Sequence, residues 1–164
     1  MNLKEFTEKY GNKEVEEAKL KELLGIKDSK VWKPKHLEEY WSLLYRGNKW
    51  VVDECVNRNQ SVTDRQFDAG LVFKTVEQAQ EEADKRNFLQ QMEIDFKNNS
   101  GVIDWENRKD KYAMVYDHED NFVEVIFRYT RQHGNLHTTN LEWLEQYIKD
   151  NEENIKKYYF GVEV

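Results

Sequence analysis

The sequence of this chain predicts an α+β domain made of two β-hairpin–helix units and preceded by an N-terminal helical extension. Three observations support this prediction: a weak internal repeat, a helix-start signal after each copy of the repeat, and a single proline. The residue before a proline is biased toward extended backbone, so Pro34 marks the end of the extension. We therefore expect the extension over residues 1–30 and the domain over residues 31–164, with its units at about 36–98 and 109–160.

The internal repeat consists of two stretches that align without a gap, EYWSLLYRGNKWVVDECV from Glu39 and KYAMVYDHEDNFVEVIFR from Lys111. Each begins with an aromatic and apolar segment, continues through a polar turn and resumes with a second apolar segment. This pattern is typical of a β-hairpin. Residues 36–45 taken alone also fit the apolar stripe of a helix, and the repeat favours a hairpin over residues 39–56 instead.

A capping box follows each copy of the repeat. Thr75 in the first copy and Thr139 in the second would accept a hydrogen bond from a free backbone N–H, and Gln78 or Glu142 would reach back three residues. The first box predicts a helix over about residues 76–97. Between each hairpin and its helix we expect an irregular stretch.

Each of the two helices should bury one apolar face. In the first helix, a single stripe at helical spacing comprises Val76, Ala79, Ala83, Phe88 (or Asn87), Met92 and Phe96. This helix should end at Asn98–Gly101, because Asn and Gly favour helix termination. The second helix should bury Leu141, Leu144, Tyr147 and Ile148, with a separate last turn over residues 150–157.

The extension mixes Lys and Glu evenly and contains few aromatic residues. Val15, Ala18 and Leu23–Leu24 recur at near-helical spacing, and Gly25 follows as a stop signal. This spacing predicts a helix over about residues 14–24.

The composition fits one globular domain with a short appendage. Of 164 residues, 38% are hydrophobic, 35% charged and 13% aromatic, so a sizeable core is available without metal or disulfide cross-links. The single Cys55 rules out an intramolecular disulfide and suits a reducing cytosol. No run approaches the ~18 apolar residues of a membrane span, and the acidic, polar start does not resemble a signal peptide. We expect a cytoplasmic protein without membrane contact.

The formal net charge of -7 has the wrong sign for sequence-independent phosphate binding. Direct nucleic-acid binding is therefore disfavoured, and basic surfaces on other proteins are favoured as partners. Carboxylates on ordered helices can occupy a nucleic-acid groove of such a partner. A solvated helix face would have the same composition. The residues expected to bind the partner are the acids of the two helices, namely Glu77, Glu81, Glu82, Asp84, Glu142, Glu145, Asp150, Glu152 and Glu153.

The sequence contains no catalytic motif. It lacks a phosphate-binding glycine loop, a Gly-x-Ser-x-Gly elbow and a Cys-x-x-Cys pair, so we expect no catalytic residue, no bound metal and no cofactor. The acidic run Asp117–Asp120 lies where the second hairpin turns, and turns favour Asp for local hydrogen bonds. The alternative is a metal-dependent nuclease that uses His118, His133 and His137.

A second alternative is a nucleic-acid-binding module. Aromatic and basic residues alternate in Trp32–Lys35 and in Phe127–Arg131, and such aromatics can stack on bases when they lie on a sheet face. The same aromatics can also fill the core of a small α+β domain. A homodimer is a further option, with Trp105 or Trp143 as an exposed anchor.

Four motifs occur in a fixed order: Trp32–Lys35, Glu39–Trp41, Gly70–Thr75 leading into Glu77–Ala79, and Lys156–Gly161. Together they resemble the pattern of a family of small phage and prophage proteins of unknown function. The resemblance covers about residues 32–160, and residues 64–67 depart from the pattern, so no role is transferred to them. The stretch from Leu141 to Ile155 is also similar to the tail of a phage-encoded anti-CRISPR protein.

The family has no assigned activity, so the resemblance implies a setting, the bacterial cytoplasm during phage infection or lysogeny. Small acidic phage proteins without catalytic motifs often bind and disable a host factor. We therefore expect a non-enzymatic, phage-type accessory protein that mimics nucleic acid. Its expected action is to bind and inhibit a bacterial nucleic-acid-handling defence protein, with a CRISPR-Cas nuclease as the favoured target.

Overall fold

The computed structural model describes residues 32–107, 110–129 and 135–162. The chain divides into two units, Met1–Lys33 and Pro34–Val164, and the description below concerns the second. The helix expected over residues 14–24 lies outside the described residues.

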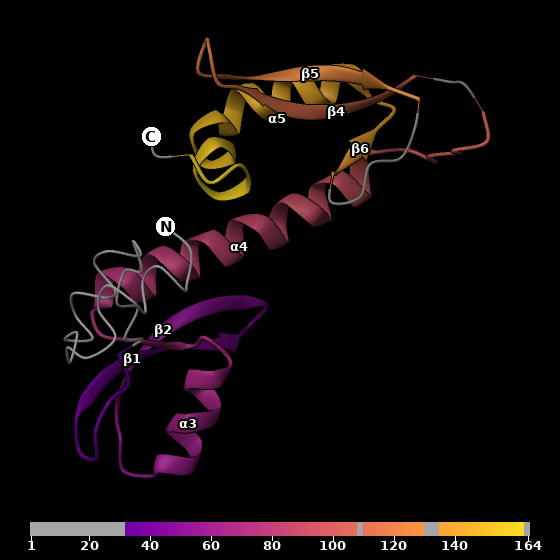
Figure 1. Ribbon diagram of the computed structural model, residues 1–164. Coiled ribbons are helices and arrows are strands. Elements are labelled where there is room, and N and C mark those ends of the chain that lie inside the picture. Colours follow the sequence, from indigo (N-terminus) through magenta and orange to yellow (C-terminus); the bar gives the residue numbers. More distant parts are fainter. Residues whose placement is uncertain (1–31, 108–109, 130–134, 163–164) are drawn as a thin grey trace, which may run out of the picture. The chain divides into compact units, whose positions relative to one another are not determined.

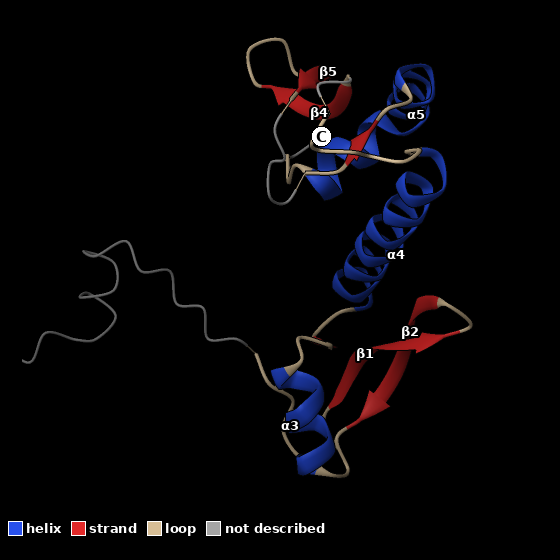
Figure 2. Ribbon diagram, turned by 90° about the vertical axis from the view of Figure 1, so that its right-hand side faces the viewer, coloured by secondary structure: helices blue, strands red, loops and turns tan. Residues whose placement is uncertain are grey.

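The second unit has the expected α+β composition (Figures 1 and 2). One antiparallel sheet has the order β2-β1-β3 and consists of β1 (Glu39–Arg46), β2 (Lys49–Val56) and β3 (Val72–Phe73). The other has the order β5-β4-β6 and consists of β4 (Lys111–Asp117), β5 (Phe122–Arg128) and β6 (His137–Thr138). The helices are α3 (Gln60–Asp68), α4 (Val76–Asn99) and α5 (Leu141–Asn154), and α5 continues into a π turn, η1 (Ile155–Tyr159).

The two hairpins have the same pairing register. Glu39 pairs with Val56, and Lys111 pairs with Arg128 at the aligned position of the second hairpin. The short third strand of each sheet pairs with the first strand of its hairpin, but the paired positions differ by one residue: β3 pairs with Trp41 and Ser42, whereas β6 pairs with Tyr112 and Ala113, and Ala113 is the position aligned with Trp41. The hairpin predicted over residues 39–56 is therefore confirmed, and the helical alternative for residues 36–45 is wrong.

The two hairpin turns differ in length. In the first, Gly47 and Asn48 both have positive φ (57° and 63°), the signature of a type I′ turn. The second turn is longer and is closed by Asp117, whose Oδ1 accepts hydrogen bonds from the backbone N–H of Glu119 and Asp120 at 2.8 and 3.2 Å. This acidic run therefore forms the turn predicted for it.

Helix α3 occupies a stretch that was expected to be irregular. Its N-cap Asn59 accepts a hydrogen bond from the Ser61 N–H at 3.1 Å. The helix packs against the face of the first sheet that carries Tyr40, whose hydroxyl donates to Gln66 Oε1 at 2.7 Å. Only Thr63 of this helix is fully buried, so the sequence has too few apolar residues to show a helical period.

Helix α4 buries side chains on two opposite sides. Ala79 and Ala83 pack in the cluster beneath the first sheet, whereas Met92 and Phe96 pack in a second cluster. At 3.6 residues per turn, Met92 lies roughly 220° round the helix axis from Ala79. The prediction of one continuous apolar stripe is therefore wrong, and Val76, expected inward, is exposed.

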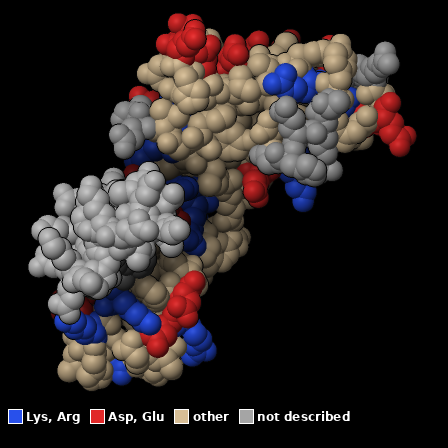
Figure 3. Space-filling view, in the orientation of Figure 1, with Lys and Arg blue, Asp and Glu red and all other residues tan. Residues whose placement is uncertain are grey.

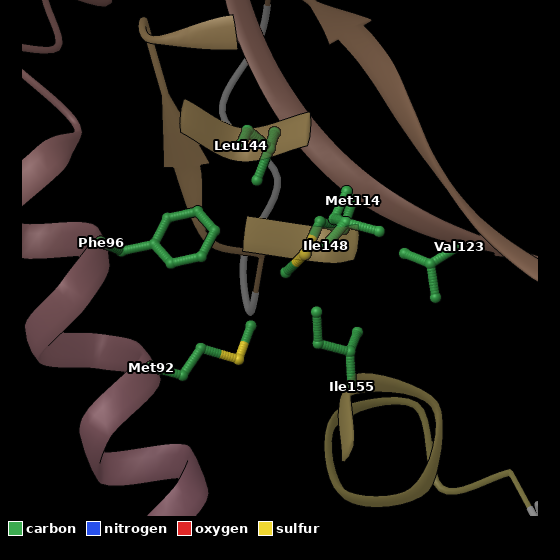
Figure 4. Close-up of a cluster of buried hydrophobic side chains, with 7 residues drawn as sticks. All are labelled: Met92, Phe96, Met114, Val123, Leu144, Ile148 and Ile155. Atoms are coloured by element: carbon green, nitrogen blue, oxygen red, sulfur yellow. The ribbon is translucent and has the colours of Figure 1, made fainter. Parts of the chain in front are cut away.

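The second cluster is the larger core, and five elements contribute to it. Its buried members point toward one another in Figure 4: Met92, Phe96, Met114, Val123, Leu144, Ile148 and Ile155. Phe96 also stacks edge-on against Trp143, with ring centroids 4.9 Å apart. The inward positions predicted for Leu144 and Ile148 of α5 are confirmed.

A latch joins the end of α4 to the start of α5. The backbone N–H and the hydroxyl of Thr139 both donate to the carbonyl of Ser100, the C-cap of α4, at 3.1 and 2.9 Å. Thr139 is therefore engaged elsewhere, and Asn140 caps α5 in its place by accepting from the Trp143 N–H at 3.2 Å. The capping box predicted at Thr139 is wrong, whereas Thr75 caps α4 as predicted.

Helix α5 has no break at Asp150, so the separate last turn predicted over residues 150–157 is wrong. The helix widens instead into η1, where the N–H of Phe160 donates to the carbonyl of Ile155 at 3.0 Å. A π turn contains one residue more than an α turn between bonded groups. This geometry brings the Phe160 ring to within 6.0 Å of the Tyr116 ring of β4.

The outer edge of β2 is covered by a side chain of α4. Asn87 Oδ1 accepts from the Trp50 N–H at 2.7 Å, and Asn87 Nδ2 donates to the Trp50 carbonyl at 2.9 Å. The amide thus takes the place of a neighbouring strand. Edge strands expose unpaired backbone groups that can pair with other chains, and this arrangement blocks the first sheet at that point.

We predict that Asn87→Ala lowers the free energy of unfolding by about 1–3 kcal/mol, because it leaves both backbone groups of Trp50 without their partner. Urea denaturation measures the change. The matched control is Asn98→Ala on the exposed surface of the same helix, which should shift stability by less than about 0.5 kcal/mol. Equal effects of the two substitutions would contradict the proposed role of Asn87.

We also predict that Gly101→Ala is more destabilising than Gly70→Ala. Both glycines have positive φ (67° and 66°), so the backbone strain is alike. A Cβ at Gly101 would lie 2.9 Å from Thr139 Oγ1, within the α4–α5 latch, whereas a Cβ at Gly70 meets nothing within 4 Å. Thermal unfolding of the two variants side by side measures the difference, and equal midpoints would show that the latch tolerates the contact.

Candidate partner-binding surface

Three of the four acids predicted on α4 share one side of the helix. Glu77, Glu81 and Asp84 fall within roughly 60° of one another round the helix axis, and all three are exposed. Glu82 lies on another side, toward the first sheet, and is partly buried. The structure therefore does not bring the four together.

Glu82 serves an internal contact. Its carboxylate accepts from Arg86 Nε at 2.7 Å, one helical turn along α4. The Arg86 guanidinium lies over the Trp50 ring of β2, 4.9 Å from its centroid. Glu82 thus positions the arginine that covers this tryptophan, and substitution of Glu82 would disturb the first sheet as well as the surface charge.

Glu81 is paired with a residue of η1. Lys157 Nζ lies 3.0 Å from a carboxylate oxygen of Glu81, and this hydrogen bond raises the pKa of Lys157. Glu77 and Asp84 line the same open groove, whose volume is about 520 Å³, together with Tyr158. The carboxylate of Asp84 also accepts from Gln80 at 2.8 Å. The acidic face of α4 is therefore partly neutralised within the chain.

Two of the predicted acids on α5 also have partners within their own helix or its continuation. Glu152 pairs with Lys156 at 2.7 Å, and Asp150 accepts from Gln146 at 2.8 Å. Both contacts connect residues four apart, which is the spacing of neighbours on a helix surface. These acids stabilise the C-terminal half of α5.

The remaining three acids of α5 form what we call the acidic row: Glu142, Glu145 and Glu153. They are exposed at roughly 100–180° round the helix axis from the buried Leu144, and none forms an ion pair within the part of the chain that the structure describes. Lys149 lies between Glu145 and Glu153 on the same face. The row extends about 16 Å along the helix axis.

The i,i+4 pairs could have been found in the sequence, because Glu82–Arg86 and Glu152–Lys156 have the spacing of helical ion pairs. The contact of Glu81 with Lys157 could not, because it depends on how η1 packs beside α4. In the view of Figure 3, acidic and basic side chains are interspersed among other residues over the described part, and neither sign forms a continuous surface.

The two described histidines of the nuclease alternative, His118 and His137, lie apart from each other. His118 is exposed at the second hairpin turn, with its ring 4.7 Å from that of Tyr116. His137 is buried in β6, pairs with Ala113 and stacks on Trp105 at 4.9 Å. Those two positions on the sheet lie roughly 13–16 Å apart along β4.

His133 lies outside the described residues. Within the ranges 32–107, 110–129 and 135–162, no group of three or more His, Cys, Asp or Glu side chains is placed to hold a metal. In the same ranges, no helix has both the length and the apolar character needed to cross a bilayer.

The aromatic residues named for the homodimer and for the nucleic-acid-binding module differ in exposure. Trp105 and Trp143, the dimer anchors, are half-buried in contacts with His137 and Phe96. Phe127 and Tyr129, in contrast, are 38% and 56% exposed at the end of β5.

The one cysteine does not have the environment of a nucleophile. Cys55 is half-buried on β2, and burial raises the pKa of its thiol, which disfavours the reactive thiolate. Its environment includes the Tyr40 hydroxyl and the Asp53 carboxylate.

Comparison of the chain with protein-family models, with curated proteins and with solved structures finds no match. The resemblance to small phage proteins therefore stays a prediction.

We predict that alkaline pH destabilises the protein through Tyr147 at the α4–α5 contact. Burial, followed by the charge of Asp95, raises the pKa of Tyr147 from 10.0 to about 12. A raised pKa means that the folded state holds its proton longer than the unfolded chain, so stability is lost as the pH rises from about 10 to about 12. Urea denaturation across this range should show a smaller loss for Tyr147→Phe than for the wild type. Tyr129→Phe, at an exposed ring, serves as the control, and an identical loss in both variants would contradict the prediction.

Proposed function

We propose that this protein is a non-enzymatic, phage-type accessory protein that binds a bacterial defence protein and inhibits it. The favoured target is a CRISPR-Cas nuclease, and the proposed mechanism is occupation of its basic nucleic-acid channel. The observation that supports this proposal is the acidic row of α5. Its three carboxylates are exposed and form no ion pair among the described residues. The helix that carries them is anchored in the core by the buried Leu144 and Ile148.

The acidic row suits such a contact better than the acids of α4. A partner that binds Glu81 or Glu82 must first break its internal pair with Lys157 or Arg86. Exposed pairs of this kind stabilise a protein by about 0–1 kcal/mol each, and that energy would be subtracted from binding. The acidic row has no such cost, apart from the nearby Lys149. The helix that carries these carboxylates is already ordered, so little backbone entropy is lost on association, whereas ordering each glutamate side chain costs about 0.5–1.5 kcal/mol.

The charge of the whole chain supports the same class of partner. A formal net charge of -7 attracts a basic surface and speeds association with it. When carboxylates replace nucleic acid in a basic channel, the channel exchanges one set of anions for another, as in counterion release. The phage resemblance motivates the bacterial cytoplasm as the proposed location.

The shared hairpin register supports a further part of the proposal, that the fold contains two hairpin–helix repeats. Glu39 and Lys111 are aligned in the sequence, and their partners Val56 and Arg128 are aligned as well. Each sheet is followed by one helix, α4 or α5, whose N-cap lies two residues beyond the third strand.

The decisive experiment measures inhibition of target-DNA cleavage by a panel of purified single-subunit Cas nucleases, each loaded with its guide RNA. We predict that simultaneous Glu142→Lys, Glu145→Lys and Glu153→Lys raises the concentration needed for half-inhibition more than about tenfold, because each reversal removes one attraction and adds one repulsion. Circular dichroism confirms that the variant is folded.

A matched control keeps the change in net charge the same. Glu39, Glu54 and Glu93 are exposed elsewhere and form no ion pair in the described part, and their simultaneous replacement by Lys should leave inhibition within about threefold. Equal loss in both triple variants would reject the acidic row in favour of net charge alone. A wild-type protein that inhibits no nuclease of the panel would reject a Cas target.

A further inference from the structure

Strand β5 is a long edge strand whose outer side has no partner within the described residues. It lies at the outside of the order β5-β4-β6 and spans seven residues (Figures 1 and 2). The other long edge strand, β2, is covered at Trp50 by the Asn87 amide. The edge strands β3 and β6 have only two residues each and offer little backbone to a partner.

The sequence of β5 lacks three of the features that protect such an edge, namely lysine, proline and a bulge. Proteins place lysine, proline or a bulge on exposed edges to prevent pairing with another chain. Strand β5 (FVEVIFR) contains no lysine and no proline, and its register with β4 is continuous. Phe122 and Phe127 are each 38% exposed, and Tyr129, just beyond the strand, stacks edge-on against Phe127 with centroids 4.5 Å apart. The open edge is therefore bordered by exposed apolar rings.

The two charged residues of β5 are self-complementary. If two β5 strands run antiparallel about a two-fold axis at Ile126, Glu124 of each copy lies opposite Arg128 of the other copy, and Val125 lies opposite Phe127. A shift of the register by two residues would place Glu124 opposite Ile126 and lose both charge pairs. Directly opposite charges stabilise an antiparallel pair, so the charges select this one register.

Neither charge is neutralised within the described chain. Glu124 and Arg128 form no ion pair there, and the hydrogen bond that Arg128 donates to the Phe127 carbonyl is long, 3.5 Å from Nη1. The cross-strand neighbour of Arg128 on β4 is Lys111, a residue of like charge. The Lys111 ammonium donates to the Asn107 carbonyl at 2.9 Å, so it adds no negative charge beside Arg128.

We propose that β5 pairs with β5 of a second copy of this chain, joining the two β5-β4-β6 sheets into one continuous antiparallel sheet across a two-fold axis. The interface is isologous, as expected for a symmetric dimer. Main-chain hydrogen bonds along the strand provide affinity, and the two Glu124–Arg128 pairs fix the register.

Sedimentation equilibrium of the full chain tests the proposal. The wild type should have about twice the monomer mass of 19.9 kDa. Glu124→Arg and Arg128→Glu should each raise the dimer dissociation constant more than about tenfold, because like charges then face each other twice in each self-pair. An equimolar mixture of the two variants should recover the dimer, since every facing pair is then opposite in charge. The double variant Glu124→Arg with Arg128→Glu should recover it as well.

The recovery separates a lost interface from a lost fold, because an unfolded variant cannot be rescued by mixing. A wild type that sediments as a monomer up to about 200 μM would overturn the proposal, since a weaker dimer would not form by mass action in a cell. A dimer that neither single variant weakens would also overturn it, because the second copy would then be held by another surface.

Discussion

The described fold depends on α4, whose 24 residues supply buried side chains to two separate clusters. Ala79 and Ala83 are small enough for the helix to approach the first sheet closely, and the larger Met92 and Phe96 fill the second core. Because the two sets lie on opposite sides, no side of α4 is apolar along its whole length. The polar residues between them form specific contacts, such as that of Asn87 with β2.

The packing of α4 on two sides also determines which of its charged residues have partners within the chain. A helix that packs on two sides has little free surface, so its acids lie close to neighbouring elements. Glu82 meets Arg86 above Trp50, and Glu81 meets Lys157. Helix α5 packs on one side only, and its outer carboxylates remain exposed.

Much of the secondary structure follows from the sequence alone. The repeat and the type I′ turn at Gly47–Asn48 define both hairpins, and Thr75 defines the start of α4. The errors have tertiary causes. Thr139 has the chemistry of a cap, but its hydroxyl bonds to Ser100, a residue far away in the sequence. Two-residue strands such as β3 and β6 are too short to show any period.

The candidate site is less accessible to sequence reasoning than the fold. The number of acidic residues and their helical positions follow from the sequence, and so do ion pairs at four-residue spacing. The sequence does not show which side of α4 packs in each cluster, because no local signal marks the change of the buried side between Ala83 and Phe88. The acidic row of α5 differs from the other predicted acids only through the partners that several of those acids have in the folded chain.

The π turn at the end of α5 makes Ile155–Tyr159 a segment whose length can change by one residue. A π turn holds one residue more than an α turn between its bonded groups, so deletion of one residue there would leave the Phe160 N–H four residues beyond Ile155, which is the spacing of an ordinary α turn. The Phe160 ring would then keep its direction toward Tyr116. Related chains should therefore show a one-residue gap in this turn more readily than in the α-helical part of α5, where a deletion turns every later side chain by about 100° round the axis.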